Sequence, residues 1–331
     1  MAAMAAAPAP PTPRRVLIVG ASGTIGRATL QALRRRGHEV VAFGRGAAPA
    51  GPPDAGLQWR QGQPADAGSI ARDGLRGERF DAIVSCLASR TGAPDDAWAI
   101  DHGAHLQLLQ AARRAGVPQW VQLSAICVQK PRLAFQHAKR AFEAELQASD
   151  LDWTIVRPTA YFKSLSGQVV RVRRGKPFLI FGDGALTACK PIGDDDLGDY
   201  LADCLHDESR RRRVLPIGGP GEAITPRQQG ERLFQLLGRP PRFKSVPPAL
   251  LATIAAGLGA AARAWPPLQA KAEFARIGHY YATESMLLWD AAAGRYDAAA
   301  TPSTGTRTLF DHYAALLRGD VRHERGEHAV F

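Results

Sequence analysis

A short apolar run followed by three regularly spaced glycines constrains the fold of this 331-residue chain more than any other feature. Residues 16–19 read Val-Leu-Ile-Val, which is typical of a strand buried on both faces of a parallel sheet. Gly20, Gly23 and Gly26 follow in a G-x-x-G-x-x-G pattern, and residues 28–33 have the composition of a helix. A strand, a tight turn and a helix in this order predict the first unit of a dinucleotide-binding fold.

The three glycines have separate expected roles in this turn. Gly20 permits the sharp turn, Gly23 lets a phosphate approach the backbone, and Gly26 lets the helix pack closely on the strand. The free N–H groups and the positive end of the helix dipole then favour a pyrophosphate over a purely structural turn. The spacing is similar to that of the short-chain dehydrogenase superfamily. The predicted cofactor-binding residues here are Gly20, Ser22, Gly23, Thr24, Ile25, Gly26 and Arg27.

The end of the next predicted strand, residues 39–45, indicates which dinucleotide binds. An NAD site usually has Asp or Glu here, which hydrogen-bonds the ribose 2′-hydroxyl. This chain has Arg45, and no acidic residue follows before Asp54. A guanidinium suits a 2′-phosphate, and Arg27 offers a second charge. We therefore expect NADPH, with two ordinary surface arginines as the alternative.

Strands and helices alternate through the first half of the chain. Predicted strands at 80–86, 120–124 and 153–158 are separated by predicted helices at 97–115 and 134–148. Such alternation with short connections predicts an α/β fold, a Rossmann-type doubly wound parallel sheet.

After residue 160 the pattern becomes irregular. Short apolar segments at 178–181 and 214–217 are followed by a helix at 226–237, for which Thr225 is a suitable N-cap. We expect a smaller substrate-binding region here, partly entwined with the sheet. The predicted organisation is a disordered N-terminal tail at 1–14, an NADP-binding Rossmann domain at 15–160, a substrate-binding region at 161–318 and a C-terminal tail at 319–331.

The net charge of +11 is the unusual feature of the composition. It suits an acidic small molecule, an anionic membrane surface or nucleic acid. No basic stripe with interleaved aromatics accompanies the arginine clusters, so we expect no nucleic-acid partner. The four cysteines form no C-x-x-C pair, so we predict no metal site and no disulfide framework.

The sequence predicts no membrane-spanning helix, because no uncharged apolar stretch reaches about 18 residues. The nearest approach is 249–265, which Arg263 interrupts. This segment suits a helix of the substrate-binding region or a helix resting on a membrane surface. Since the N-terminus also lacks the features of a secretory signal, we expect a cytoplasmic protein.

The catalytic residues of the superfamily are only partly present. Its members normally use a serine and a Tyr-x-x-x-Lys pair, whose tyrosine exchanges a proton with a carbonyl or hydroxyl substrate. Ser124 ends a predicted strand and Lys139 lies on the next helix, either as the pair's lysine or as a solvated residue. Phe135 stands at the tyrosine position and cannot donate a proton. Alcohol–ketone chemistry is therefore disfavoured, whereas hydride transfer to another group stays open.

Longer, irregular segments carry a more specific resemblance, which extends over roughly residues 15–318. They resemble signatures of the NADPH-dependent divinyl chlorophyllide 8-vinyl reductases, which reduce the 8-vinyl group of divinyl chlorophyllide or protochlorophyllide to ethyl during (bacterio)chlorophyll synthesis. Gln63 is a departure from related dinucleotide folds, which often place Asp against the adenine. The resembling segments are 124–131, 156–165, 181–184, 189–192, 215–221 and 280–286.

The resemblance implies a vinyl group that accepts hydride at its terminal carbon and a proton at its inner carbon. The implied proton donors are Lys139 and Tyr161 first, then His137, Lys163 or water. His137 lies on a different helix face from Lys139 and is expected on the surface. The predicted catalytic residues are Lys139, Tyr161 and Ser124, with Lys139 also on the cofactor, and the predicted substrate-binding residues are Tyr161, Phe162, Lys163 and Phe181.

Two other functions stay open at this point. One is an isoflavone-reductase-like double-bond reductase acting on another conjugated substrate, and the other is a non-catalytic NADP(H)-sensing regulator. The implied substrate is a large apolar pigment with a propionate, for which Lys163, Lys190 or Arg157 offer a cation. The basic surface also suggests peripheral contact with a photosynthetic membrane of a bacterium. The sequence does not fix the oligomeric state.

Overall fold

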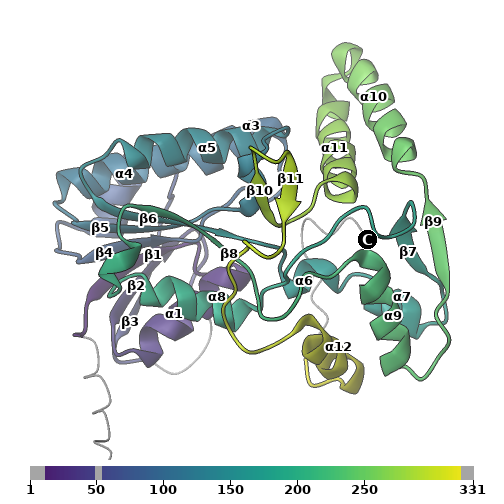
Figure 1. Ribbon diagram of the computed structural model, residues 1–331. Coiled ribbons are helices and arrows are strands. Elements are labelled where there is room, and N and C mark those ends of the chain that lie inside the picture. The colour runs from purple at the N-terminus through teal and green to yellow at the C-terminus, as the bar shows by residue number, and fades with distance from the viewer. Residues whose placement is uncertain (1–11, 49–53, 322–331) are drawn as a thin grey trace, which may run out of the picture.

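A single parallel sheet organises the computed structural model, which describes residues 12–48 and 54–321 (Figure 1). Its strands run in the order β3-β2-β1-β4-β5-β6-β8, and every pair is parallel. This order confirms the predicted doubly wound sheet, whose ligands bind beyond the carboxyl ends of the strands. The strands are β1 (Arg15–Val19), β2 (Glu39–Gly44), β3 (Leu57–Gln61), β4 (Ala82–Ser85), β5 (Gln119–Leu123), β6 (Asp152–Pro158) and β8 (Arg213–Ile217).

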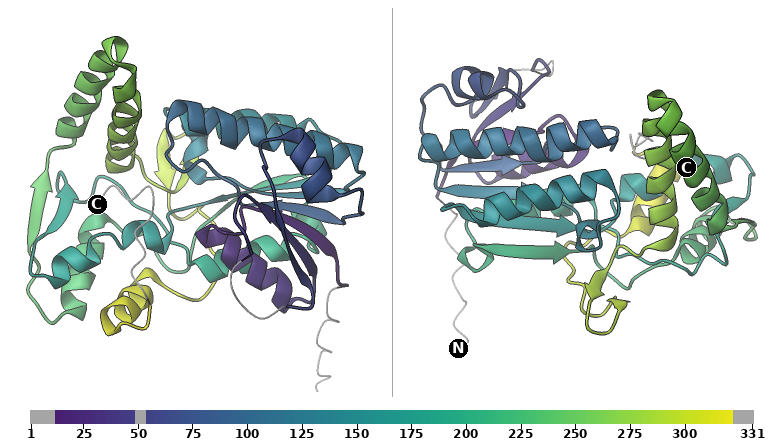
Figure 2. Two further views of the ribbon diagram at one scale, coloured as in Figure 1. Left: turned by 180° about the vertical axis from the view of Figure 1, so that it is seen from behind. Right: turned by 90° about the horizontal axis from the view of Figure 1, so that it is seen from above.

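Helices cover both faces of this sheet, as Figures 1 and 2 show. Alternate residues of β1 serve the two faces, because successive side chains of a strand point in opposite directions. Val16 and Ile18 pack in the core beneath α1 (Thr24–Arg35) and α8 (Asp194–Asp203). Leu17 packs in the core beneath α4 (His105–Arg114) and α5 (Ala134–Gln147).

The helix predicted at 97–115 is divided into three parts. It begins as α3 (Pro94–Ala97), widens into the π-helix η2 (Trp98–Ala104) and continues as α4. Such wide turns are rare and often occur at functional sites. This one turns Asp101 inward, where the side chain is fully buried. Further short segments after β3 are α2 (Ala67–Ser69) and η1 (Ile70–Leu75).

A second lobe has its own apolar core beyond the carboxyl end of the sheet. The apolar segment 178–181 is β7, but it pairs with β9 and not with the main sheet. The helix predicted after Thr225 begins there, with a capping box between Thr225 and Gln228. This lobe contains α6 (Phe162–Leu165), α7 (Val169–Arg173), β7 (Phe178–Phe181), α9 (Pro226–Leu236), β9 (Phe243–Val246) and α12 (Leu309–Arg318).

Two hairpins complete the described chain: a helical hairpin of α10 and α11, which follows β9 directly, and a strand hairpin of β10 and β11. None of the helices in the described part is long and apolar enough to cross a membrane. The predicted tails fall largely at 1–11 and 322–331, outside the described residues. The remaining segments are η3 (Ile126–Gln129), η4 (Glu208–Arg210), α10 (Pro248–Ala264), η5 (Pro266–Leu268), α11 (Gln269–Thr283), β10 (Leu288–Asp290) and β11 (Arg295–Asp297).

Candidate active site

The glycine-rich turn between β1 and α1 has the geometry expected from its sequence. Gly20 has φ +84°, and a Cβ there would lie 2.5 Å from the carbonyl carbon of Cys86. A Cβ on Gly26 would lie 2.0 Å from the carbonyl oxygen of Gly20. Both positions therefore require glycine for the packing of the chain itself.

Gly23 differs from the other two glycines. A Cβ there would meet only the carbonyl oxygen of Gly20, at an ordinary 3.4 Å. Gly23 is also the N-cap of α1, so it has no side chain with which to satisfy the first N–H groups of that helix. The open space and the helix start fit the approach of a phosphate.

Two cationic side chains lie at this helix start. The Nζ of Lys163 donates to Oγ1 of Thr24 at 3.1 Å, and Nη1 of Arg27 donates to the carbonyl of Ser22 at 2.8 Å. Lys163 is therefore not where the sequence predicted it, since it lies at the turn and does not line the cavity described below. The reason is the β-bridge between Tyr161 and Ile192, which holds α6 beside the start of α8, the helix packed against α1.

A buried carboxyl group accompanies these cations. Burial raises the pKa of Asp194 to about 6, the charge of Asp195 adds to the rise, and Lys163, Arg307 and Arg27 oppose it. The Oδ1 atom of Asp194 has no hydrogen-bond partner among the described residues. The start of α1 therefore lies beside two cationic side chains and a carboxyl group, Asp194, whose pKa is raised.

Arg45 follows β2 directly, at the carboxyl edge of the sheet, as predicted. Its carbonyl accepts a hydrogen bond from Nε2 of Gln61 at 3.1 Å, which fixes the backbone, while its side chain is exposed. A 2′-phosphate would meet an accessible guanidinium at this position.

A cavity of about 370 Å³ opens beyond the carboxyl ends of β4, β5 and β6. It lies between the sheet and the second lobe, where an open α/β sheet places its ligands. Four of the predicted catalytic and substrate-binding residues line it together, namely Ser124, Lys139, Tyr161 and Phe181.

Lys139 is held in place by a buried carboxylate. Its Nζ lies 2.8 Å from Oδ1 of Asp101, and its side chain is only 12% exposed. The second oxygen of Asp101 accepts from Oγ of Ser89 at 2.6 Å. Lys139 is therefore not a solvated helix residue but a positioned cation on the cavity wall.

Ser124 belongs to a second buried network. Its Oγ donates to Oε1 of Glu143 at 2.5 Å, and the same oxygen accepts from Nε of Arg157 at 3.1 Å. The charge of Arg157 is thus satisfied within the protein. Lys190 is likewise buried, and its Nζ donates to the carbonyl of Thr301 at 2.9 Å. Neither cation is placed to meet a pigment carboxylate.

Tyr161 is one of the residues that line the cavity. Its hydroxyl group makes no hydrogen bond to any of the described residues. Burial raises the pKa of Tyr161, and negative charge on Cys86, Cys127 or Asp194 would raise it further. The phenol therefore keeps its proton at neutral pH. Phe135 lines the same cavity.

Comparison with known proteins decides the family. Residues 20–208 match the NAD(P)H-binding family model. The chain is 45% identical to the chloroplastic divinyl chlorophyllide a 8-vinyl-reductase of Oryza sativa subsp. indica, over 97% of this chain and 83% of the relative. The chain belongs to the divinyl chlorophyllide a 8-vinyl-reductase family. Because that relative is chloroplastic, the predicted bacterial cytoplasmic location stays a prediction.

Solved structures support the fold of this 8-vinyl-reductase family member. An epimerase from Methanothermobacter thermautotrophicus is 14% identical with a TM-score of 0.66, and the match covers 93% of each chain. The Bordetella bronchiseptica enzyme WbmG in complex with NAD is 21% identical with a TM-score of 0.61, over 71% of this chain and 82% of that chain. At these identities the likeness concerns the fold alone.

Phe162 is the other predicted substrate-binding residue that the reductase cavity does not include. It is 3% exposed, packs in the core of the second lobe and lies 5.5 Å from the ring of His312. Phe162 starts α6, and the first turn of this helix directs Phe162 and Lys163 away from the cavity that Tyr161 lines.

Sequence reasoning missed three residues on the reductase cavity wall. Tyr281 lies in the last turn of α11 and Glu284 directly follows this helix, both inside the segment 280–286 that carried the family resemblance. Burial raises the pKa of Tyr281 well above its usual value, and Cys127 adds to the rise. Cys127 also lines the cavity. The resembling segments themselves were the signal that could have located these residues.

Glu284 is the centre of a cationic cluster at this wall. It accepts from Nζ of Lys130 at 2.7 Å, from Nη1 of Arg132 at 2.8 Å and from the hydroxyl of Tyr296 at 2.5 Å. The Arg132 side chain is mostly exposed. Two cations share one carboxylate, so the cluster has an excess positive charge beside an apolar cavity.

Proposed function

We propose that this protein reduces the 8-vinyl group of 3,8-divinyl chlorophyllide a or protochlorophyllide a to an ethyl group, with NADPH as the reductant, in (bacterio)chlorophyll synthesis. The 45% identity to the rice 8-vinyl-reductase over nearly the whole chain carries the proposal. A mostly apolar cavity next to a dinucleotide-binding turn supports it, because the reaction needs a pigment and a dinucleotide in contact.

The residues at the turn fit the dinucleotide. In this proposal the start of α1, the space at Gly23 and the side chain of Lys163 hold the pyrophosphate. Lys139, fixed by Asp101, hydrogen-bonds the nicotinamide ribose from the cavity side. When bound at these residues, NADPH would supply the hydride for the terminal vinyl carbon, and the conjugated macrocycle would delocalise the negative charge.

Tyr161 is the proposed proton donor to the inner vinyl carbon. Its phenol is protonated at neutral pH, the residue lines the cavity, and its hydroxyl makes no hydrogen bond to another side chain among the described residues. The vinyl C=C bond gains a hydride and a proton and becomes an ethyl group, and the phenolate regains its proton from solvent. Phe135 in place of the usual tyrosine is compatible with this reaction, since no carbonyl oxygen has to be protonated.

The propionate of the pigment is assigned to the cluster around Glu284. Lys130 and Arg132 provide one positive charge in excess of Glu284, and Arg132 is accessible. Phe181 and Tyr161 face the apolar part of the macrocycle. This replaces the predicted contacts with Lys163, Lys190 and Arg157, whose cations are bound elsewhere in the protein.

An assay with purified protein tests the proposed reaction. Protein, NADPH and divinyl chlorophyllide a are incubated with and without air, and the pigments are separated by chromatography. The proposal expects a monovinyl product heavier by two hydrogen atoms that requires NADPH. Absence of product under both conditions, or turnover of other conjugated substrates alone, contradicts it.

The preference for NADPH is tested with Arg45→Ala. Because the exposed guanidinium is the proposed partner of the 2′-phosphate, its loss is expected to raise the KM for NADPH roughly tenfold and to leave the KM for NADH nearly unchanged. Equal changes for both cofactors would show that Arg45 does not select between them.

A further inference from the structure

The α10–α11 hairpin projects away from the rest of the molecule, as the two views in Figures 1 and 2 agree. Helix α10 has 17 residues, of which Arg263 is the one with a charged side chain. Ala255 is the one residue of this helix that is buried within the described structure. Most of the remaining residues of this apolar helix are exposed, and the others are half-buried.

Large apolar side chains are concentrated on this hairpin. Seven large apolar residues of the described chain are exposed, and five of them lie between residues 250 and 281. Trp265, at the outer end of α10, is the most exposed of these at 65%. Such a concentration of exposed apolar side chains on one element is typical of an interaction site. Four of the five, Leu250, Ile254, Trp265 and Phe274, are not part of the cavity wall, whereas Tyr281 lines the cavity at the base of the hairpin.

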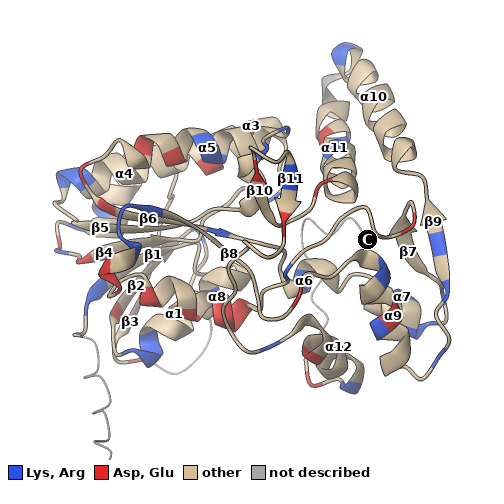
Figure 3. Cartoon of the chain, viewed as in Figure 1, with Lys and Arg blue, Asp and Glu red and all other residues tan. Residues whose placement is uncertain are grey.

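The exposed charges of the hairpin all have one sign. Arg263, Lys271 and Arg276 are exposed, whereas Glu273, its one acidic residue, is buried and bonded to Arg276 at 3.0 Å. Neither Arg263 nor Lys271 has a carboxylate partner among the described residues. Figure 3 shows α10 without charge along most of its length and with a basic residue at its outer end.

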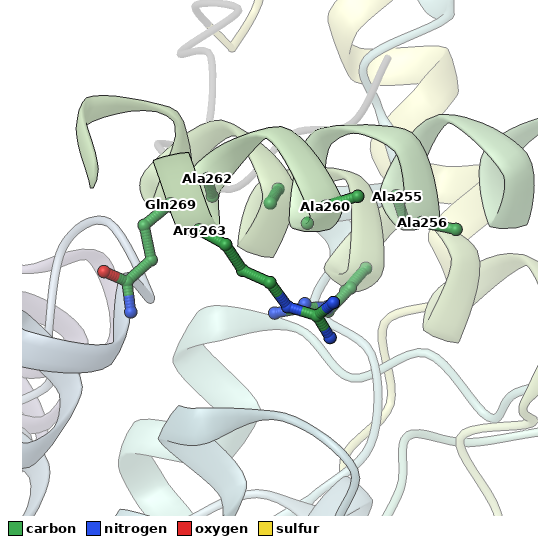
Figure 4. Close-up of a pocket in the computed structure, with 9 residues that line it drawn as sticks. Ala255, Ala256, Ala260, Ala262, Arg263 and Gln269 are labelled. Carbon is green, nitrogen blue, oxygen red and sulfur yellow. The ribbon is translucent and has the colours of Figure 1, made fainter. Parts of the chain in front are cut away.

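A groove of about 650 Å³ runs between the two helices. Small residues of α10, including Ala256 and Ala260, keep it open, and Arg263 lines it (Figure 4). Arg276 of α11 lines the same groove. The Arg276 guanidinium would lie 2.9 Å from a Cβ on Gly259, so it rests directly on α10. The two arginines thus give the groove a cationic character next to the apolar side chains.

We propose that the α10–α11 hairpin docks on a lipid bilayer that contains anionic lipids. Leu250, Ile254 and Trp265 enter the boundary between headgroups and acyl chains, and Arg263 and Lys271 pair with lipid phosphates. Tryptophan with basic neighbours is a preferred composition at this boundary. A second copy of the chain fits the surface less well, because a symmetric contact would bring equal positive charges together.

The base of the hairpin connects this surface to the cavity. Ile277 and Tyr281 of α11 belong to the cavity wall, so a docked hairpin holds the cavity close to the bilayer. A pigment dissolved in the bilayer would then reach the cavity directly. Only this delivery of pigment rests on the proposed function; the docking itself does not.

Vesicle flotation tests the proposal with the full-length protein. Vesicles of phosphatidylcholine alone are compared with equimolar phosphatidylcholine and phosphatidylglycerol at low and high salt. Wild-type protein is expected to float with the anionic vesicles and to be released by salt. The double variant Leu250→Gln/Ile254→Gln is expected to bind roughly tenfold more weakly, and Arg263→Glu roughly fivefold.

Arg114→Glu is the matched control for the charge change. Arg114 is exposed at the end of α4, which lies at the opposite end of the molecule in Figure 1, and its loss should leave flotation unchanged. Circular dichroism and NADPH binding check that each variant is folded.

Two results would overturn the docking proposal. One is that folded wild-type protein does not float with the anionic vesicles, or that the hairpin variants float as well as wild type. The other is that light scattering shows a dimer that the same variants dissociate, which would make a second copy the occupant. Reductase activity, measured on detergent-dissolved pigment, reports on the proposed function separately.

Discussion

Tyr161 is the residue on which the proposed chemistry depends most. If its phenol donates the proton, Tyr161→Phe is expected to lower kcat roughly 10²–10⁴-fold with little change in the KM for NADPH. Steady-state kinetics on divinyl chlorophyllide a measure both constants. Tyr281→Phe is the matched control, since Tyr281 also lines the cavity but its hydroxyl interacts with Cys127. Equal effects of the two substitutions would assign the proton to another group.

At the residue scale, the sequence predicted which residues form the glycine-rich turn better than it predicted which way individual side chains point. Gly20 and Gly26 could be assigned because the motif encodes backbone geometry, which the structure shows at both positions. Phe162 and Lys163 could not, because one turn of helix decides whether a side chain faces a cavity or a core. The burial of Asp101 could not be predicted from the sequence, because it depends on a π-helix, and no sequence periodicity indicates a π-helix here.

At the scale of elements, helix α6 decides whether Lys163 contacts the pigment, as the sequence predicted, or the dinucleotide, as its contact with Thr24 indicates. The structure places its Nζ on Thr24 at the start of α1, so Lys163→Met is expected to raise the KM for NADPH roughly tenfold or more while the KM for the pigment stays nearly constant. The exposed Lys176 offers a control, Lys176→Met, with the same loss of charge outside the site. A rise in the pigment KM alone would restore the assignment made from sequence.

Elements in the first half were predictable because each buried strand has a continuous apolar run. The edge strand β3 was missed because its residues, Leu57–Gln61, are largely polar and partly exposed. In the second half, β7 and β8 look alike in sequence, yet β8 extends the main sheet and β7 pairs with β9. Local composition does not contain the long-range pairing that distinguishes them.

For the whole molecule, a buried histidine predicts a pH dependence of stability. Burial, with the charge of Lys139 adding to it, lowers the pKa of His105 to about 4, whereas an unfolded histidine titrates near about 6.5. Between these values the unfolded chain binds a proton that the folded chain does not. The free energy of unfolding is therefore expected to fall by up to about 3 kcal/mol as the pH is lowered from about 6.5 to about 4.

Urea unfolding at a series of pH values measures this dependence. His105→Gln removes one titrating group and is expected to reduce the slope of the profile, whatever its effect on stability at neutral pH, while His38, whose pKa burial also lowers to about 4, keeps part of the slope. His137→Gln, at an exposed position on α5, should leave the slope as in wild type. An unchanged slope in His105→Gln would mean that other groups carry the acid sensitivity.

The central claim concerns where the hydride goes, and isotope transfer tests it most directly. With NADPH deuterated at its transferable position and divinyl chlorophyllide a as substrate, mass spectrometry and NMR locate the label in the product. The account predicts one deuterium at the terminal carbon of the new 8-ethyl group, and solvent deuterium at the inner carbon when the reaction is run in D₂O. Label from NADPH at the inner carbon, or no label in the pigment, would contradict it.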